Sequence, residues 1–469
     1  MKGKVFMQNS NSTPLAQRFT IFSLLRFAAP SIGMMLVISL YTVTDGIFIG
    51  RYAGAAALAA SNIVYPAINL IFGLAIMLAT GGSALVAKNL GEKRMAAASR
   101  RFTLLVAAGA ATGLLLALGI ALFFTPLLQL LGASPQLFAD CRLYLGLLLP
   151  FFPAAALMVI FNAFYIADGR PSQGFLVSIG SGLANAVLDY VFLAHFGLGI
   201  AGAALATGLA DLLAAIIGLV YFARFSRTLR LRPFKAELPV LRAACNNGAS
   251  ELVTQLSVGV VTFLFNIITF RWAGENGVAA ISVILYAEML LTSILMGFTN
   301  GVAPVFSYHY GARHHGELTR LLKISLGIIT TFGLLAFAAS RLLATPLIAL
   351  FLPDGGPAFT LTLSGFLLFS LSFLLVGFNL FASGFFTALS NGRTSALLSF
   401  VRNLAGIVIF LMLLPRELGI AGVWLAVPAA DAAALLLTLF CLYNENRTLQ
   451  ERQKATTTKY KTIFSTKVL

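Results

Sequence analysis

Six acidic residues lie within long apolar stretches of the sequence, where a charged side chain is costly. An ionised carboxylate near the middle of a bilayer costs roughly 2.5–3.5 kcal/mol on insertion scales. Such a group persists where it faces water, pairs with another group, or binds and releases a cation or a proton. These carboxylates are the first candidates for chemistry in this chain: Asp45, Asp189, Asp211, Glu251, Glu288 and Asp431.

The first half of the chain holds the polar residues best suited to binding a small cation. Asn185 and Asp189 are four residues apart, so they share one face of a predicted helix. Carboxylate, amide and hydroxyl oxygens suit Na⁺, and two neighbouring carboxylates can instead share one proton. The alternative, that each polar group merely caps or cross-links helices, is common in membranes. The candidate residues for cation or proton coupling are Asp45, Tyr144, Asn162, Asn185, Asp189 and Thr207.

Composition places the whole chain in a membrane. Of its 469 residues, 59% are hydrophobic and 10% are charged, and the mean hydropathy is +0.91. A soluble protein carries about 25% charged residues, so a water-soluble enzyme is excluded. The three cysteines form no CxxC pair and no metal cluster with the four histidines, so neither a disulfide nor a zinc site is predicted. The sequence has no phosphate-binding P-loop, and no resident cofactor is predicted.

Glycine, proline and charged residues divide the apolar sequence into twelve predicted membrane-spanning helices. A span needs about 20 apolar residues, and a charge-free stretch such as 52–87 can hold one together with a polar turn. The predicted helices cover residues 24–50, 56–80, 102–131, 143–166, 173–195, 198–222, 243–270, 278–305, 320–352, 359–388, 394–415 and 419–443. The expected fold is therefore an all-α polytopic membrane protein.

Lysine and arginine are distributed unequally between the two sides of this predicted topology. The side that holds both termini carries 27 of them, and the opposite side carries 5. Because basic residues favour the cytoplasmic side, both termini are expected in the cytoplasm and the protein in the cell membrane. The net charge of +16 then reflects orientation in the bilayer, and no nucleic-acid partner is predicted.

The two halves of the sequence repeat each other at an offset of 220 residues. Leu198–Gly202 recurs as Leu418–Gly422, and nine of the fourteen residues in 198–211 are identical to those in 418–431. The matching pieces fall on equivalent sides, so two six-helix lobes should be related by an axis along the membrane normal. The predicted organisation is a cytoplasmic segment (1–23), an N-lobe (24–222), a basic cytoplasmic linker (223–242), a C-lobe (243–443) and a cytoplasmic tail (444–469).

The repeat also divides the acidic residues into those that have a counterpart in the other half and those that have none. Asp45 corresponds to Phe265, so this carboxylate has no counterpart in the second half, as expected of a functional group. If Asp45 and Asp189 share one ion, their carboxyl groups lie within roughly 4–8 Å of each other. Asp211 and Asp431 occupy equivalent positions, which favours a shared structural role. Glu251 and Glu288 belong to the second half alone; each either recognises a cation from a cavity wall or is satisfied by its neighbours.

Several stretches of the chain together resemble the multidrug and toxic compound extrusion (MATE) family, especially its bacterial DinF-like and MepA-like branches. The resemblance covers about residues 20–445, and its most specific parts are 40–54, 81–91, 185–189, 199–207, 247–251, 303–312 and 386–393. It implies secondary antiport, in which organic and often cationic or amphipathic compounds leave the cell in exchange for Na⁺ or H⁺. The two lobes would alternate the access of a central cavity to the two sides of the membrane.

The resemblance also implies roles for individual residues. In similar proteins an N-lobe cation site uses an aspartate of helix 1, an asparagine and an aspartate of helix 5 and a threonine of helix 6. These correspond to Asp45, Asn185, Asp189 and Thr207, with Na⁺ as a candidate metal ion. The helix-4 tyrosine and asparagine correspond to Tyr144 and Asn162, and the proline that bends helix 1 to Pro30. A C-lobe coupling site in one branch uses an acidic residue of helix 10, whereas 360–388 contains none, which favours the N-lobe.

The expected function is therefore export of small organic substrates by an antiporter that acts as a monomer in the bilayer. One alternative is a lipid-linked saccharide flippase of the same superfamily, which often carries basic cavity residues. Here the basic residues within helices are Arg26, Arg341 and Arg402, each predicted toward a helix end. A membrane-embedded enzyme or a receptor is the other alternative, and no nucleophile or histidine–carboxylate constellation supports an enzyme.

Overall fold

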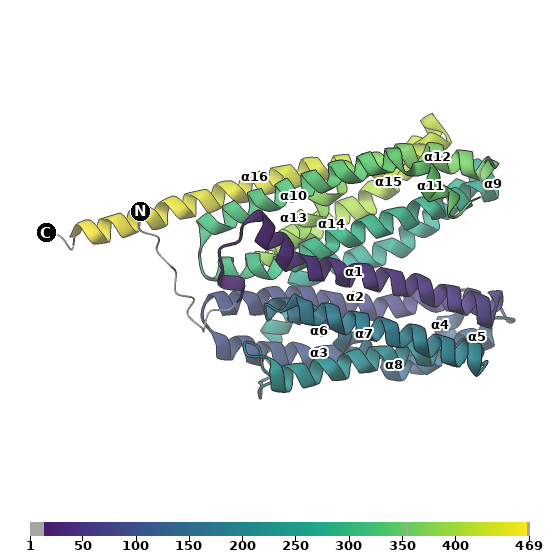
Figure 1. Ribbon diagram of the computed structural model, residues 1–469, viewed down its shortest axis with the longest axis horizontal. Coiled ribbons are helices and arrows are strands. Elements are labelled where there is room, and N and C mark those ends of the chain that lie inside the picture. Colours follow the sequence, from purple (N-terminus) through teal and green to yellow (C-terminus); the bar gives the residue numbers. More distant parts are fainter. Residues whose placement is uncertain (1–13, 353–354, 467–469) are drawn as a thin grey trace.

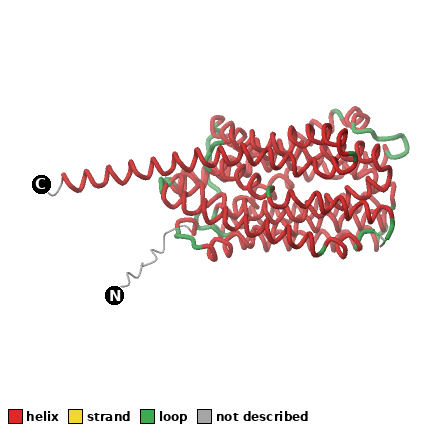
Figure 2. The backbone as a smooth tube through the Cα atoms, turned by 90° about the horizontal axis from the view of Figure 1, so that it is seen from above, coloured by secondary structure: helices red, strands yellow, loops and turns green. Residues whose placement is uncertain are grey.

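The computed structural model describes residues 14–352 and 355–466, and these form a bundle of long helices with no strand among them. Figure 2 shows the helices running along the long axis of the molecule, with short loops joining them mainly at its two ends. The start of α1 and the end of α16 lie at the same end of the bundle (Figure 1). This arrangement fits an even number of membrane crossings.

Helices of the two sequence halves gather on opposite sides of the molecule. In Figure 1, α2, α3 and α6–α8 lie in the lower part, and α10 and α12–α16 lie in the upper part. We refer to α1–α8 as the N-lobe and to α9–α16 as the C-lobe. The N-lobe helices are α1 (Ile21–Phe48), α2 (Ala55–Gly91), α3 (Met95–Leu122), α4 (Phe124–Leu130), α5 (Phe138–Leu148), α6 (Phe152–Ala167), α7 (Pro171–Asp189) and α8 (Gly199–Val220).

The C-lobe has the same number of helices with a longer first member. Its helices are α9 (Leu238–Gly311), α10 (His315–Leu342), α11 (Ala344–Ala349), α12 (Pro357–Phe369), α13 (Val376–Ala388), α14 (Gly392–Phe400), α15 (Ile407–Leu418) and α16 (Ile420–Thr466). Short 3₁₀ segments are η1 (Pro14–Ala16), η3 (Leu149–Phe151) and η6 (Ser370–Leu374); π-helical segments are η2 (Ile49–Ala53), η4 (Tyr190–His195), η5 (Tyr221–Phe225) and η7 (Val401–Gly406).

The prediction of twelve membrane crossings is confirmed once α9 is counted as two. Within the described residues, 11 helical stretches are long and apolar enough to span a bilayer, and α9 has 74 residues. At 1.5 Å per residue a straight helix of that length would extend about 110 Å, over three times the hydrocarbon thickness. The helix is interrupted at Gly274 (φ 59°, ψ −149°), a conformation that glycine adopts without steric strain. The sequence predicts this interruption between its helices 243–270 and 278–305.

Reciprocal close contacts between α2 and α9 confirm the internal repeat. A Cβ atom added at Gly91 would lie 2.0 Å from the carbonyl oxygen of Tyr308, and one added at Gly311 would lie 2.1 Å from that of Lys88. Both pairs exchange under the offset of 220 residues, as expected for a pseudo-two-fold axis between the lobes. Glycine is required at both positions because any side chain would separate the two helix backbones.

Irregular turns follow two of the candidate site residues. The π-helical segment η2 begins four residues after Asp45, and η4 begins directly after Asp189. A π-helical turn rotates the side chains around it relative to an ideal α-helix and often marks a functional site. Pro30 lies inside α1, which continues as a helix on both sides of it. The missing amide of proline makes this a natural place for α1 to bend.

A buried carboxylate ties the end of the N-lobe to the segment that leads into the C-lobe. Asp168, which follows α6, accepts hydrogen bonds from the Tyr221 hydroxyl (2.8 Å), the Ser226 hydroxyl (2.8 Å) and the Leu229 amide (3.0 Å). Burial raises the pKa of Asp168, and the three hydrogen bonds oppose that rise. The residue fixes where the chain leaves α8 and turns toward α9.

Replacing Asp168 with alanine is therefore expected to destabilise the protein. Hydrogen bonds to a charged group contribute about 1.5–3 kcal/mol each, and the substitution would leave three donors unpaired, so a loss of at least about 3 kcal/mol is expected. Thermal unfolding of the purified protein measures this, and Tyr221→Phe, which removes one of the three bonds, is the graded control. Equal melting temperatures for Asp168→Ala and the unaltered chain would contradict this role.

Candidate cation-binding site and central cavity

A cavity of about 170 Å³ lies inside the N-lobe and is lined by several of the predicted coupling residues. Asp45 reaches it from α1, Tyr144 from α5 and Thr207 from α8. The wall also includes Tyr41, one helical turn before Asp45. Carboxylate, phenol and hydroxyl oxygens from three helices therefore converge inside one lobe, where a small cation or a proton can bind.

Asp45 and Asp189 lie against each other although they belong to different helices. Their carboxyl groups are near enough to interact with each other electrostatically, which links the end of α7 to the wall of the N-lobe cavity. Asp189 is 0% exposed, and Asn185, one turn earlier on the same face, is 2% exposed. The arrangement brings together the three residues that the sequence singles out as a possible shared site.

These buried polar atoms lack partners among the described residues. Oδ1 of Asp45, both carboxyl oxygens of Asp189, both side-chain polar atoms of Asn185 and the Thr207 hydroxyl are buried without a hydrogen bond. Two ionised carboxylates are both acceptors, so they can pair only when a proton or a cation lies between them. Burying such atoms without a partner is costly. The donor set of two carboxylates, an amide and a hydroxyl matches the oxygen ligands that Na⁺ prefers.

No basic side chain in the described part of the chain compensates this group of carboxylates. The ion pairs found among the described residues involve Glu92, Glu288, Glu317, Asp431 and Glu451. The N-lobe carboxylates are therefore left to interact with one another. Whatever neutralises them must come from outside the protein or as a proton.

Asp211 belongs to this site, contrary to the shared structural role predicted for it and Asp431. Its side chain lines the N-lobe cavity and lies within electrostatic reach of Asp45. Asp431, at the equivalent position, instead accepts a hydrogen bond from Arg402 at 2.7 Å. The repeat fixes where the two aspartates lie in each lobe, whereas the helices around them supply different partners.

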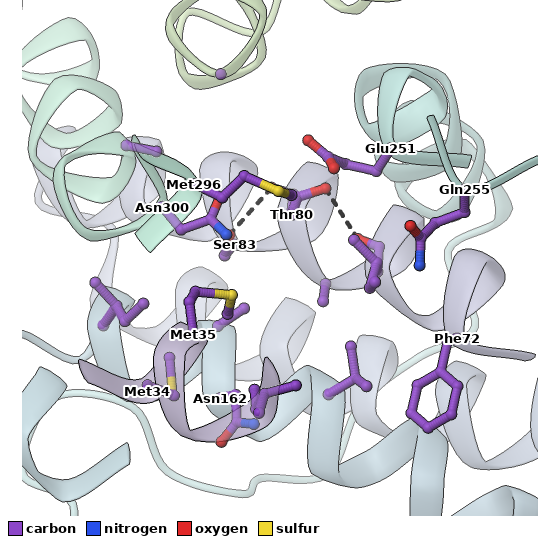
Figure 3. Close-up of a pocket in the computed structure, with 18 of the residues that line it drawn as sticks. Met34, Met35, Phe72, Thr80, Ser83, Asn162, Glu251, Gln255, Met296 and Asn300 are labelled. Carbon is purple, nitrogen blue, oxygen red and sulfur yellow. Dashed lines mark hydrogen bonds between the residues drawn. The ribbon is translucent and has the colours of Figure 1, made fainter. Parts of the chain in front are cut away.

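A second and larger cavity of about 260 Å³ lies between the lobes. Figure 3 shows Glu251 and Gln255 of α9 on one side of it and Asn162 of α6 on the other. Thioether side chains contribute much of the remaining wall: Met34, Met35, Met158 and Met296. Methionine adapts its shape to different ligands, and Glu251 supplies a negative charge, so this wall suits apolar organic cations of varied outline.

Asn162 does not join the coupling residues with which the sequence grouped it. It lines the central cavity and is absent from the wall of the N-lobe cavity. The two cavities are nevertheless neighbours because Tyr41, Thr42, Tyr65 and Phe72 line both. A change at the Asp45–Asp189 pair can therefore reach the central cavity through a single layer of side chains.

Glu288 is the predicted cavity residue that the structure places elsewhere. It lines neither the N-lobe cavity nor the central cavity, and its Oε1 lies 3.9 Å from Nη2 of Arg402. The side chain of Arg402 is 9% exposed and lies inside the C-lobe. The two residues form an ion pair, which the sequence could not reveal because they are 114 positions apart.

Tyr41 and Tyr65 line the N-lobe cavity although the sequence reasoning did not select them, and Asp211 lines it although that reasoning gave it a structural role. Tyr41 precedes Asp45 by four residues, so helical spacing alone places it on the same face. Tyr65 carries no comparable signal, because it belongs to a different helix, α2, and no sequence spacing relates it to Asp45.

Comparison with known proteins places this fold in a recognised architecture. A sequence profile of the MatE family matches residues 30–191 and 252–412. The multidrug export protein MepA of Staphylococcus aureus is 21% identical over 425 residues, which cover 90% of this chain and 93% of that protein. A crystal structure of a MATE protein in its straight conformation has a TM-score of 0.87 at 22% identity and covers 94% of this chain and 98% of that one. A MOP superfamily transporter from Pyrococcus furiosus, described as having a binding pocket of reverse polarity, has a TM-score of 0.86 at 21% identity. The match covers 93% of this chain and 98% of that one.

Proposed function

The chain belongs to the MatE family of multidrug efflux transporters, and we propose that it is an antiporter that exports organic cations or amphipathic compounds in exchange for Na⁺ or H⁺. The observation that carries this proposal is the electrostatic interaction between the half-buried Asp45 and the fully buried Asp189, two carboxylates without a basic partner among the described residues. Their site adjoins a larger cavity that contains Glu251. One site thus suits the driving ion and the other suits its cationic cargo.

Ion binding changes the stability of one packing of the N-lobe relative to another. Without a cation or proton, the carboxylates of Asp45 and Asp189 repel each other and favour a packing that separates them. Binding removes that repulsion and favours close approach of α1 and α7. A difference of a few kcal/mol is enough to switch the dominant conformation.

The side chains around this pair would complete the ion site and transmit its state. Asn185 and Thr207 would provide neutral oxygen ligands, and Tyr144 would hydrogen-bond from the opposite wall. Because α1 lines both cavities, a bend at Pro30 would change the ion site and the substrate cavity together. Asn162, which lines the central cavity, would contact the substrate, and its part in coupling would be indirect.

The proposed transport cycle uses the two lobes as its moving parts. The N-lobe (24–222) and the C-lobe (243–443) would open the central cavity to alternate sides of the cell membrane, with both termini in the cytoplasm. Both cavities are built from this one chain, so a monomer would suffice for transport.

The charges of the central cavity favour an organic cation over a lipid-linked saccharide phosphate. Its lining includes Glu251 and no basic residue among the described side chains. A phosphate-bearing lipid would need arginine or lysine there to compensate its charge. Arg402 lines a small neighbouring cavity, which shares Glu251 with the central cavity, and Asp431 already neutralises it there.

Uptake of a fluorescent organic cation into everted membrane vesicles tests the proposal. Vesicles with the unaltered chain should accumulate the dye when a Na⁺ or proton gradient is imposed, and control vesicles without the chain should not. Accumulation that ignores both gradients would contradict antiport. Transport of a lipid-linked saccharide without dye transport would support the flippase instead.

Replacing Glu251 with glutamine should weaken transport of cationic substrates more than it weakens ion coupling. The substitution removes the negative charge of the central cavity and leaves the Asp45–Asp189 pair unchanged. A buried charge contact of about 1.4 kcal/mol changes affinity tenfold, so we expect the half-saturating concentration of a monovalent cation to rise roughly tenfold. Glu275→Gln, an exposed site near the α9 turn, is the matched control. Loss of the ion response with unchanged substrate affinity would move coupling into the C-lobe.

A further inference from the structure

Helices of the C-lobe converge on the guanidinium of Arg402, which lies in the π-helical segment η7. Its Nε donates to Oδ1 of Asp431 on α16 at 2.7 Å, and its Nη1 donates to the side chain of Asn403 at 2.7 Å. Its Nη2 lies 3.9 Å from Oε1 of Glu288 on α9. With a side chain 9% exposed, Arg402 is a buried cation between two acidic residues.

Neutral side chains hold the carboxylate of Asp431 in place for this contact. The Asn379 amide of α13 donates to Oδ1 of Asp431 at 3.2 Å and to its backbone oxygen at 3.0 Å. The Thr438 hydroxyl donates in turn to the Asn379 carbonyl at 2.8 Å, which fixes the orientation of the amide. Arg402 therefore compensates the charge of Asp431, and the Asn379 amide orients the Asp431 carboxylate.

The N-lobe has the equivalent aspartate without the arginine. Asp211 corresponds to Asp431 at the offset of 220 residues. Arg402 corresponds to position 182 at that offset and to position 179 at the offset of 223 that relates Gly169 to Gly392. Residues 179–182 are Ile-Gly-Ser-Gly, so the N-lobe has no basic side chain at this place under either alignment.

We propose that Arg402 is a tethered cation that permanently occupies, in the C-lobe, the role that a mobile Na⁺ or proton fills in the N-lobe. A guanidinium stays charged at any physiological pH, so it neutralises Glu288 and Asp431 in every step of a cycle. The C-lobe carboxylates then neither take up nor release an ion. The chain has one exchangeable cation site, in the N-lobe, and the C-lobe contributes to the substrate cavity alone. This assignment of coupling to one lobe rests on the function proposed above, whereas the tethered charge in the C-lobe does not.

Chemical rescue tests the tethered charge without measuring transport. Arg402→Ala leaves the buried Asp431 and the partly buried Glu288 without their cation, and breaking the buried Arg402–Asp431 pair should lower the melting temperature of the purified full chain by roughly 5–10 °C. Guanidinium chloride at about 20 mM should return at least half of that loss by binding the vacated site, whereas urea at the same concentration should not. Arg402→Lys, which keeps the charge, and Arg402→Ala with Asp431→Asn, which removes the main anionic partner, should both show no response to guanidinium.

Direct binding of radiolabelled guanidinium completes the test and separates it from the proposed function. The measurement uses chains that also carry Asp45→Asn, so that the N-lobe site does not contribute. We expect about one bound guanidinium per Arg402→Ala chain, because the free ion occupies the place of the missing side chain. The chain with Arg402 intact should bind none, because its own guanidinium already fills that place. Three results would each overturn the tethered-cation proposal: unchanged stability of Arg402→Ala, equal rescue of that variant by urea, or rescue by guanidinium of the variant that carries both Arg402→Ala and Asp431→Asn. Each of these results stands whether or not Asp45 proves to couple export to an ion gradient.

Discussion

Asp45→Asn should reduce ion-driven export to the level of vesicles that lack the protein, while the chain still inserts and folds. The amide has nearly the same size as the carboxyl group but does not change charge during a cycle. Asp189 would then face a neutral partner, and the repulsion that drives separation of α1 and α7 would be gone. Uptake of a fluorescent cation into everted vesicles under an imposed ion gradient measures the effect.

The control for this substitution is Asp140→Asn, the same chemical change at an acidic residue of α5 that lines neither cavity. It should leave the rate of ion-driven uptake within about twofold, as expected for a surface substitution. Unchanged uptake by Asp45→Asn at equal amounts of protein would show that this carboxylate does not couple transport.

Asp189→Asn should weaken ion binding and uncouple export from the gradient. The substitution leaves Asp45 as the single carboxylate of the pair, so a bound cation loses one of its two charged ligands. We expect the ion concentration for half-maximal transport to rise roughly 10- to 100-fold, equivalent to about 1.4–2.8 kcal/mol. The dependence of the initial transport rate on Na⁺ concentration, and separately on pH, measures this shift.

A neutral ligand of the same site provides the comparison for Asp189. Thr207→Val removes a hydroxyl and no charge, so its effect on the ion concentration should have the same direction and a smaller size. If Thr207→Val shifted the ion dependence more than Asp189→Asn did, the two carboxylates would not be the principal ligands.

The sequence predicts the fold closely because apolar length and repetition are local properties of the chain. Charge-free stretches fix the twelve crossings, and the offset that relates Gly91 to Gly311 reappears as a reciprocal contact between α2 and α9. The meeting of Asp45 and Asp189 is also predictable. Both lie in the same half and have no counterpart in the other half. A charged side chain within the membrane is costly, and contact with an ion or with a partner group offsets that cost.

The sequence misses features that depend on how distant helices are rotated toward each other. Asn162 has the same residue type as Asn185, yet α6 turns it to the central cavity. Glu288 is satisfied by Arg402 of a different helix, and nothing in the spacing of either residue indicates that pairing. Asp211 and Asp431 match in the repeat and differ in their partners, because the segment 179–182 offers no arginine.

Transport by the purified chain in proteoliposomes, with Na⁺ and proton gradients imposed separately, tests the central claim most directly. At least one gradient should drive a fluorescent organic cation into the liposomes against its own gradient, and the same gradient should drive none with Asp45→Asn. Concentrative uptake that persists in Asp45→Asn, or uptake that neither gradient drives with the unaltered chain, would contradict export coupled through the N-lobe carboxylates.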